Sequence, residues 1–236
     1  MKISIITIVY NDYTGLKRTR RSVLEQIQKP FEHIVVDGKS PDNTLKALTF
    51  FEEKPEIVIS EQDKGIYHAM NKGVRLASGD FVIFLNAGDT FFTNRTLKDL
   101  MSRTLDPKTV YFGNFFLIRP PHLGKTTEPR ELTFFDSLPF NHQSCLTPLN
   151  LLIENPFDEQ LRILGDLKFY KKLFQNKIPF VHLDIVIAKY TMDGISSIPS
   201  FHYLKEVWLL NRDSSLYKKI LFSIKYAVKY VLHRLV

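Results

Sequence analysis

The sequence predicts an α/β protein with a doubly wound, mainly parallel sheet, a mixed second half, and amphipathic helices at its C-terminal end. Three observations predict this architecture. Short apolar runs alternate with helical segments over the first 90 residues, which is typical of a parallel sheet with helices on both faces. The alternation stops after about Val110, and apolar side chains recur at helical spacing after residue 201.

Strands and helices are expected to alternate from the first residues onward. Residues 3–9 predict a buried strand, because they are rich in β-branched side chains and show no polar alternation. A helix from about Thr14 to Gln28 is expected next, and Lys29-Pro30 ends it. The following elements are, in order, the strand His33 to Val36, a helix capped by Ser40 that runs to about Phe51, the strand Ile57 to Ile59, the helix Gly65 to Ala77, and the strand Phe81 to Leu85.

The second half is less regular and rich in aromatic side chains. Its expected elements are a strand at Val110 to Ile118, a Pro- and Gly-containing connection at Arg119 to Arg130, a helix at Gly165 to Asn176 and a strand at Phe180 to Ala188. Such an irregular segment is expected to shape a specific substrate site. We therefore divide the chain into one domain over residues 1–200, with halves 1–110 and 111–200, and a tail over residues 201–236.

Composition excludes several classes of protein. The chain has 236 residues, of which 44% are hydrophobic and 24% are charged, and this balance excludes a disordered or fibrous protein. Its single cysteine, Cys145, forms no internal disulfide, so a reducing cytosol is the expected compartment. The apolar run from Ile3 to Tyr10 is too short for a signal peptide, and no small-residue cleavage site follows it. We expect a cytoplasmic protein.

The positive charge is concentrated in the tail. The chain carries a formal charge of +7, and residues 201–236 hold seven Lys or Arg against Glu206 and Asp213. The tail thus accounts for +5, and the first 200 residues account for +2. No nucleic-acid partner is expected, because the basic excess does not spread over the domain.

The end of the tail predicts a basic amphipathic helix. Its apolar positions recur every three or four residues at Tyr217, Ile220, Leu221, Ile224, Ala227, Val228, Val231 and Leu235. Lys218, Lys225 and Lys229 fall on another face, and no apolar stretch is long enough to span a bilayer. We expect residues 213–236 to lie on an anionic membrane surface, with the protein peripheral on the inner face of the cell membrane. The alternative is a helix packed on its own domain or on a second copy of the chain, as in a homo-oligomer.

Common nucleotide and hydrolase motifs are absent from the sequence, which contains no GxxxxGK[ST], no GxGxxG after the first strand and no GxSxG. Ligands of a parallel sheet bind beyond the carboxyl ends of its strands. Those ends carry polar residues at Tyr10-Asn11, Asp37, Ser60 to Asp63 and Asn86 to Asp89. A crevice lined by carboxylates accepts a phosphate ligand when Mg²⁺ or Mn²⁺ bridges the two.

Five ordered segments carry a resemblance to a known family. They are Ile5 to Asn11, Asp37 to Thr44, Ser60 to Gly73, Ala77 to Asp80, and Leu85 to Asp89. Each is a weak match alone, but five in the right order over roughly the first 90 residues are specific. Together they resemble family 2 glycosyltransferases with the GT-A fold. The resemblance implies an inverting transfer of a sugar from a nucleoside diphosphate donor.

The resemblance also implies a nucleotide site in the first half. Asp37 matches the carboxylate that hydrogen-bonds the nucleobase. Thr7 and Tyr10 border the nucleoside, and Asp63 lies beside the nucleoside. Lys72 falls on the helix after the third strand, where it either neutralises a phosphate or is simply solvated.

Asp89 matches the last Asp of the family's metal-binding motif. Asn86 and Gly88 stand where carboxylates are often found, which leaves Asp89 as the charged ligand. We still expect Mn²⁺ or Mg²⁺, because diphosphate oxygens and waters can complete an octahedral shell around one carboxylate. The alternative is that Asp89 only caps a following helix.

The second half resembles the acceptor half of the family more loosely, through Phe140 to Ser144, Phe157 to Glu159 and Gly165 to Tyr170. Asp166 takes the place of the Asp that opens a helix and acts as general base on the acceptor hydroxyl. The alternative for Asp166 is a plain helix cap. His142 is expected to contact the acceptor or the diphosphate, or to serve as a structural hydrogen-bond partner.

The function expected from these residues is an inverting glycosyltransferase. Its acceptor would be a hydroxyl of a polysaccharide or a lipid-linked oligosaccharide. Two alternatives remain open at this point: a sugar-1-phosphate nucleotidyltransferase, and a non-catalytic protein whose tail docks on a membrane or another subunit. The first alternative should show a Gly-rich, basic loop after the first strand, and Tyr10 to Tyr13 is not such a loop.

Overall fold

The computed structural model describes residues 1–119, 123–129, 138–191 and 200–234. The strands are β1 (Ile3–Val9), β2 (Glu32–Asp37), β3 (Ile57–Ser60), β4 (Phe81–Phe84), β5 (Thr90–Phe91), β6 (Val110–Arg119), β7 (Leu123–Thr127), β8 (Cys145–Pro148) and β9 (Phe180–Thr191). The helices are α1 (Tyr13–Leu24), α2 (Ile66–Leu76), α3 (Thr96–Met101), α4 (Leu149–Glu154), α5 (Gly165–Gln175), α6 (Phe201–Leu210) and α7 (Leu216–Arg234), with the 3₁₀ helices η1 (Thr44–Phe50) and η2 (His142–Ser144).

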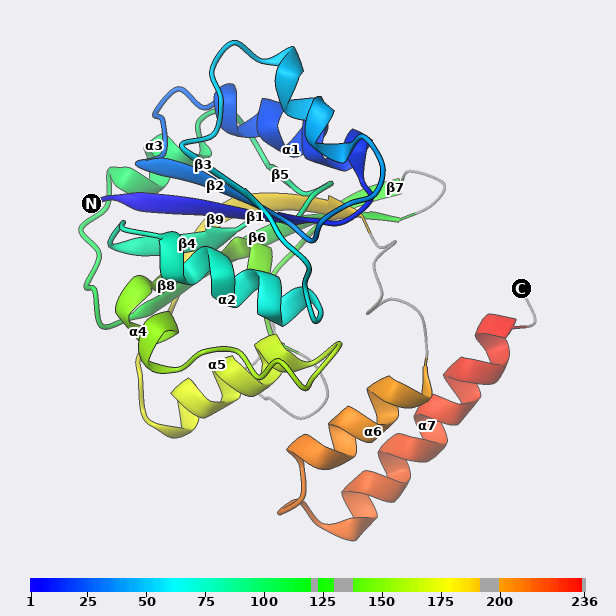
Figure 1. Cartoon of the computed structure of the whole chain (residues 1–236). Coiled ribbons are helices and arrows are strands. Elements are labelled where there is room, and N and C mark those ends of the chain that lie inside the picture. The colour runs from blue at the N-terminus through cyan, green and yellow to red at the C-terminus, as the bar shows by residue number, and fades with distance from the viewer. Residues whose placement is uncertain (120–122, 130–137, 192–199, 235–236) are drawn as a thin grey trace.

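The described strands form one twisted sheet in the order β3-β2-β1-β4-β8-β6-β9-β5, with β7 paired to β6. Strands β3, β2, β1 and β4 run parallel to one another, as expected for a doubly wound half. Strand β8 is antiparallel to both β4 and β6, so it joins a mixed second half to the parallel one. The expected fold class is confirmed (Figure 1).

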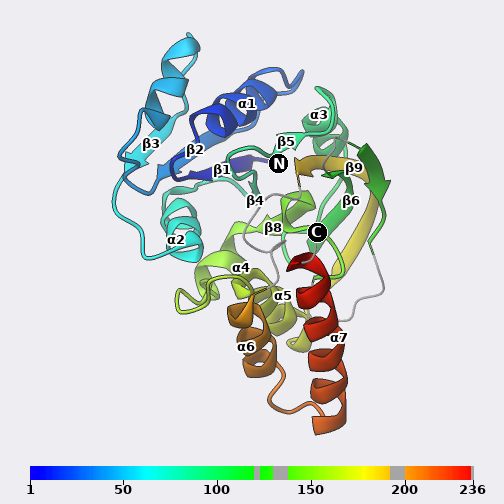
Figure 2. The same cartoon turned by 90° about the vertical axis from the view of Figure 1, so that its right-hand side faces the viewer.

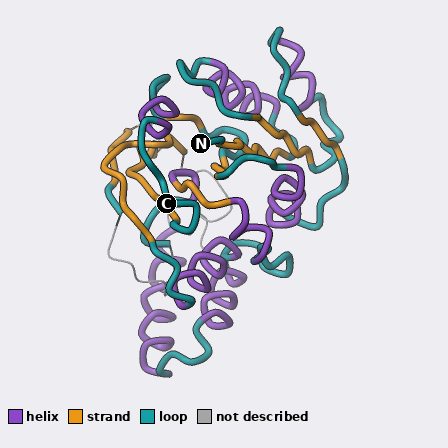
Figure 3. Tube along the Cα trace, turned by 90° about the vertical axis from the view of Figure 1, so that its left-hand side faces the viewer, coloured by secondary structure: helices purple, strands orange, loops and turns teal. Residues whose placement is uncertain are grey.

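Strand β1 lies at the centre of the core. All seven of its residues are buried, because helices cover both faces of the sheet (Figures 1 and 3). Ile6 packs in the apolar cluster with α2, α4 and α5, whereas Ile5 packs in a second cluster with Val23 of α1 and Leu97 of α3. Burial on both faces explains the continuous apolar run without polar alternation.

The expected helix after Ser40 differs in the structure. Ser40 does not cap a helix, because its hydroxyl donates to Asp37 at 2.5 Å. The helical segment is the short 3₁₀ helix η1, and Asp42 accepts the backbone N–H of Thr44 at its start. The sequence expectation of an α-helix to Phe51 was therefore wrong in type and start.

Two other boundaries differ. Helix α1 ends at Leu24 rather than Gln28, since the buried Gln26 side chain turns away to bond the backbone of Thr93 and Leu97. The expected connection at 119–130 contains β7, which forms an antiparallel hairpin partner for β6. Residues 120–122 and 130 of that connection lie outside the described part of the chain.

The tail forms a hairpin of two helices, α6 and α7, below α5 (Figure 2). Val207 of α6 is fully buried in the same apolar cluster as α5, and Tyr203 of α6 stacks on Tyr226 of α7 with ring centroids 5.2 Å apart. Among the described residues, no helix is both long enough and apolar enough to cross a membrane. The side chains of Lys225 and of 228–236 lie outside the described residues.

Candidate active site at the carboxyl ends of the parallel strands

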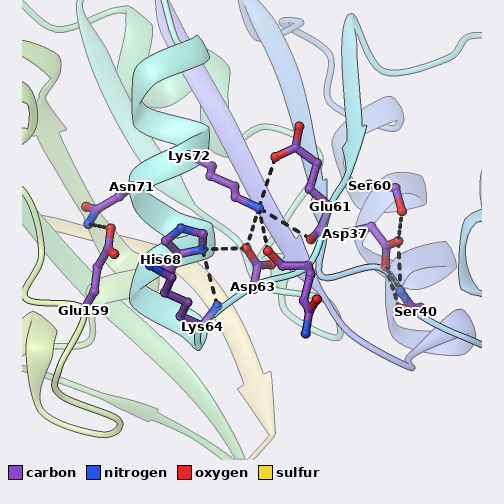
Figure 4. Close-up of polar contacts among 11 residues, drawn as sticks. Asp37, Ser40, Ser60, Glu61, Asp63, Lys64, His68, Asn71, Lys72 and Glu159 are labelled. Carbon is purple, nitrogen blue, oxygen red and sulfur yellow. Dashed lines mark hydrogen bonds and ion pairs between the residues drawn. The ribbon is translucent and has the colours of Figure 1, made fainter.

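The loops after β1, β2, β3 and β4 meet at one edge of the sheet, as the parallel topology requires. The buried Asp37 ends β2 and accepts hydrogen bonds from the Ser40 hydroxyl and from the Ser60 hydroxyl at 2.6 Å (Figure 4). These contacts join the loops after β2 and β3. The two hydroxyls therefore hold the Asp37 carboxylate in a fixed position at this edge of the sheet.

Tyr10 and Asp63 gather around Gly38, which follows Asp37. A Cβ atom at Gly38 would lie 3.1 Å from the Asp63 carboxylate and 3.2 Å from the Tyr10 ring, so the glycine allows both to approach. The Tyr10 side chain is largely exposed, which leaves its ring face open to a ligand. Three of the expected nucleotide residues thus lie together: Tyr10, Asp37 and Asp63.

Lys72 of α2 reaches the same loop. Its Nζ lies 2.9 Å from Asp63 and 3.3 Å from Glu61, and it donates to the carbonyl of Gln62 at 3.1 Å (Figure 4). Burial alone would lower the pKa of Lys72, but the Asp63 and Glu61 carboxylates outweigh it and raise that pKa. Its ammonium is therefore charged and orders the loop between β3 and α2.

Thr7 lies elsewhere. Its side chain is fully buried on the α1 side of the sheet, where the hydroxyl is 2.9 Å from Nε2 of His33. Arg20 of α1 donates to Nδ1 of the same ring at 2.9 Å. Burial, with a smaller effect of Arg20, lowers the pKa of His33 to about 3, so the imidazole is neutral. Thr7 therefore contributes to the packing between β1 and α1 and is not exposed at the strand ends.

Asp89 lies in the turn after β4 and is buried. Its backbone N–H donates to the Asn86 carbonyl at 2.9 Å, and its carboxylate accepts from Nε2 of Gln143 at 3.0 Å. Gly88 in this turn has a φ of +98°, a conformation that favours glycine. Strand β5 follows Asp89, so the alternative that Asp89 caps a helix does not describe this turn.

Asp166 lies in the first turn of α5, one residue beyond the helix start, and the N-cap is Leu164. One carboxylate oxygen lies 3.0 Å from the Tyr67 hydroxyl, and the other lies 3.0 Å from Nδ1 of His142. Burial, followed by the charge of Asp166, raises the pKa of Tyr67 well above its ordinary value, so the phenol keeps its proton.

His142 contacts both Asp166 and the turn that carries Asp89. Its Nε2 lies 3.4 Å from the Asn86 amide, in the turn that carries Asp89. Asp166 and Asp89, 77 positions apart in the sequence, are thereby linked through one imidazole. The contact explains why the second-half motif around His142 lies at the exit of β4.

Sequence reasoning missed the roles of Tyr67 and Gln143. The ring of Tyr67 is buried, and its hydroxyl reaches Asp166. Gln143 follows His142 directly, and a polar pair at the start of a buried segment was the available signal. Its partner Asp89 could not be identified from spacing.

The donor set in this region suits a hard divalent cation. Among the described residues, Asn86 Oδ1 and Gln143 Oε1 are buried oxygens without a hydrogen-bond partner, and both residues contact the Asp89 turn. A carboxylate with neutral amide oxygens is the chemistry that Mg²⁺ or Mn²⁺ prefers. Among the described residues, no group of three or more His, Cys, Asp or Glu side chains is arranged to hold a metal ion, so a bound ligand would have to supply further oxygens.

Comparison with known families decides between the alternatives. The model of "Glycosyl transferase family 2" matches residues 4–150, which is more than half of the chain. The chain belongs to this family. It is a glycosyltransferase that uses a nucleotide-sugar donor, and the nucleotidyltransferase and non-catalytic alternatives are set aside.

Curated proteins similar to this chain are also named as glycosyltransferases. The Escherichia coli UDP-Glc:alpha-D-GlcNAc-diphosphoundecaprenol beta-1,3-glucosyltransferase WfgD is 28% identical over 212 residues, which are 87% of this chain and 83% of that protein. A PGL/p-HBAD biosynthesis glycosyltransferase of Mycobacterium bovis is 28% identical over 81% of this chain and 77% of its own length.

Solved structures share the fold of this glycosyltransferase. S. aureus TarS 1–349 in complex with UDP-GlcNAc matches with a TM-score of 0.70 and 20% identity, over 93% of this chain and 69% of that chain. The mannosyltransferase PcManGT of Pyrobaculum calidifontis, in complex with GDP-Man and Mn²⁺, matches with a TM-score of 0.63 and 16% identity, over 95% and 64%.

Proposed function

We propose that this family 2 enzyme transfers a sugar, with inversion, from a nucleoside diphosphate donor to a hydroxyl of a lipid-linked or polysaccharide acceptor. The observation that carries the proposal is the pairing of Asp166 with His142 and Tyr67 beside the turn that bears Asp89. This pairing supports a general base close to a diphosphate site at one edge of the sheet.

The nucleoside would lie over the loops after β1 and β2. The exposed ring of Tyr10 offers a stacking face, and Asp63 lies against the same glycine as Tyr10. The Ser40 and Ser60 hydroxyls donate to Asp37 and hold it in place, and Asp37 is the candidate partner of the nucleobase. Lys72 supports the site by neutralising Asp63 and Glu61, and a phosphate would have to compete with them for its ammonium.

Asp89, with the amide oxygens of Asn86 and Gln143, would hold the divalent cation. When bound, Mn²⁺ or Mg²⁺ supplies positive charge to the leaving diphosphate. Gln143 orients the Asp89 carboxylate by donating to one of its oxygens. This hydrogen bond would hold the carboxylate in position before the nucleotide-sugar binds.

Asp166 would take the proton of the acceptor hydroxyl. As the acceptor oxygen attacks the anomeric carbon, its proton passes to an Asp166 oxygen and the bond from that carbon to the diphosphate oxygen breaks on the opposite face. Tyr67 and His142 contact the two oxygens of Asp166 and fix the orientation of the carboxylate. Inversion follows from a single displacement of this kind.

A lipid-linked acceptor agrees with the surface of the tail. On α7, Phe222, Ser223 and Tyr226 face α6, and the opposite face exposes an apolar stripe. The stripe consists of Tyr217 (74% exposed), Ile220 (46%), Leu221 (40%) and Ile224 (57%). Arg212, just before α7, and Lys218, in its first turn, are exposed basic residues close to the stripe in sequence. We propose that this stripe lies on the anionic inner face of the cell membrane, where a lipid-linked acceptor would be found.

A titration and a transfer assay test the proposed function. The enzyme should bind UDP or GDP more tightly with Mn²⁺ than without, as measured by calorimetry. A panel of UDP- and GDP-sugars with a GlcNAc-diphospho-lipid acceptor should then identify a transferred sugar. No metal-dependent nucleotide binding, or no donor turnover with any member of the panel, would contradict the proposal.

A further inference from the structure

Helix α6 carries a buried carboxylate in an otherwise basic tail. Glu206 is 7% exposed, and the tail that contains it has a formal charge of +5. A buried carboxylate needs hydrogen-bond donors to offset the loss of hydration. Its donors therefore show what Glu206 does.

Three consecutive backbone N–H groups donate to Glu206. Arg162 bonds one carboxylate oxygen at 2.8 Å, and Ile163 and Leu164 bond the other at 3.1 and 2.9 Å. Charge-assisted bonds of this kind are about twice as strong as neutral ones. The segment 162–164 is thus held from outside by a side chain more than 40 positions later in the sequence.

This segment leads directly into the helix that bears Asp166. Helix α5 has no side-chain N-cap of its own, and Leu164 is its capping residue. The Ile163 carbonyl lies 2.7 Å from the Tyr67 hydroxyl, the same hydroxyl that contacts Asp166. Glu206 therefore acts on the backbone that sets the position of both the base and its Tyr67 partner.

Further contacts hold the same region. Lys171 of α5 donates to the carbonyl of Leu210 and to the side chain of Asn211, both at 2.8 Å, so α5 and α6 are tied at a second point. Upstream of residues 162–164, Asn71 of α2 exchanges two hydrogen bonds with the backbone of Phe157, each 2.9 Å long. The Asn71 amide also donates to the Glu159 carboxylate (Figure 4). Glu206 completes this set of anchors at the end nearest Asp166.

We propose that Glu206 is a positioning residue for the catalytic base, and that the α6–α7 hairpin is consequently part of the active site. The proposal rests on the proposed role of Asp166 as base. The same hairpin that carries the exposed apolar stripe would then also support residues 162–164, which lead to Asp166.

The test is a double-mutant cycle with Glu206→Gln and Asp166→Asn, in the full chain. Release of UDP from UDP-glucose, or from the donor that the panel identifies, gives kcat and KM, and UDP titration with Mn²⁺ gives Kd. Glu206→Gln should lower kcat by about 10- to 100-fold, as expected for a displaced catalytic group, and leave the UDP Kd within about twofold. In the Asp166→Asn background, Glu206→Gln should have little further effect, because both changes act through one group.

Control variants separate positioning from folding. Asp213→Asn removes the other acid of the tail, which is exposed, and should leave kcat unchanged. If Glu206→Gln does not fold at the assay temperature, Glu206→Asp carries the test, since it keeps the charge and shortens the reach. It should lose less kcat than Glu206→Gln, with the same UDP Kd.

The outcomes are distinct. Additive effects of Glu206→Gln and Asp166→Asn, or a parallel loss of kcat and UDP binding with a lowered melting temperature, would overturn the positioning role. So would unchanged kcat in the folded Glu206 variants. Full activity of Asp166→Asn would instead contradict the proposed function, because the base itself would then lie elsewhere.

Discussion

At the scale of a residue, Asp166 is distinguished by side-chain contacts to both of its carboxylate oxygens. The sequence indicated its place at a helix start but left open whether it was a cap or a base. The structure places it within the first turn, with Tyr67 on one oxygen and His142 on the other. A plain cap would not need two side chains aimed at its carboxylate.

Replacing Asp166 with Asn should therefore abolish most turnover. Removal of a positioned base costs about 10²–10⁴-fold in rate, and Asn keeps the shape but takes no proton. We expect kcat to fall by that factor with the UDP Kd unchanged, measured by donor turnover and calorimetry. Asp158→Asn is the matched control, because Asp158 pairs with Lys168 on the exposed side of α5. If the control loses turnover and Asp166→Asn does not, Asp158 is the better candidate for the base.

Asp89→Asn should remove the dependence of nucleotide binding on metal. The change keeps an oxygen that can accept from Gln143 but deletes the negative charge that attracts a cation. Calorimetry should show that Mn²⁺ no longer strengthens UDP binding, while the melting temperature stays close to that of the unaltered enzyme. A Mn²⁺ effect of the original size in this variant would remove Asp89 from the metal site.

His33 makes a prediction about acid stability. Its pKa is about 3 in the folded chain against an ordinary value of 6.5, so between these values only the unfolded state takes up the proton. Stability from this group is complete above about pH 6.5 and is lost as the pH falls toward 3. The loss between pH 7 and pH 5 should be about 2 kcal/mol.

Urea unfolding at the two pH values measures this loss. His33→Gln keeps polar atoms for Thr7 and Arg20 but does not titrate, so its free energy of unfolding should change less between pH 7 and pH 5. The difference between the two proteins isolates His33 from the other titrating groups. Equal changes in both would show that His33 is not buried as a neutral imidazole.

At the scale of elements, periodicity predicted the long segments and missed the short ones. Strand β1 was predicted at its observed bounds, and α5 within one residue, because each repeats its pattern over several positions. Strand β5 has two residues and exists through its pairing of Thr90 and Phe91 with β9. No local pattern can reveal such an element, because its cause is a partner about 100 positions away.

The tail helix gives a prediction at the same scale. Reversing two exposed basic residues close to the apolar stripe in sequence, in the variant Arg212→Glu with Lys218→Glu, should weaken binding to anionic vesicles by about 30-fold or more. Vesicle sedimentation at several salt concentrations measures this, and binding of the unaltered enzyme should fall as salt rises. UDP binding should stay unchanged, since the change leaves the residues proposed to bind the nucleotide in place.

The matched control reverses two exposed lysines of the first half, Lys98→Glu with Lys108→Glu, and has the same net charge. It should bind vesicles like the unaltered enzyme. Equal loss in both variants would show a general charge effect, and salt-insensitive binding or no binding by the full chain would rule against the membrane surface. A dimer that hides the stripe would appear in light scattering as a doubled mass.

At the scale of the whole molecule, the sheet assembles a site from distant parts of the chain. The strand ends were predictable because the carboxyl ends of parallel strands share one edge. The contacts of Gln143 with Asp89 and of Glu206 with 162–164 were not, since both depend on how the second half and the tail fold back onto the sheet. Thr7 was expected to border the nucleoside, and alternation along β1 turns its side chain toward α1, where it contacts the buried His33.

The anomeric configuration of the transferred sugar tests the central claim most directly. With an α-linked UDP-sugar as donor and the acceptor that the panel identifies, a single displacement assisted by Asp166 predicts a β-linked product. Proton NMR of the purified product reads the configuration from the coupling of the anomeric proton. A β-linked product that is lost in Asp166→Asn is the predicted result, and an α-linked product would contradict the account.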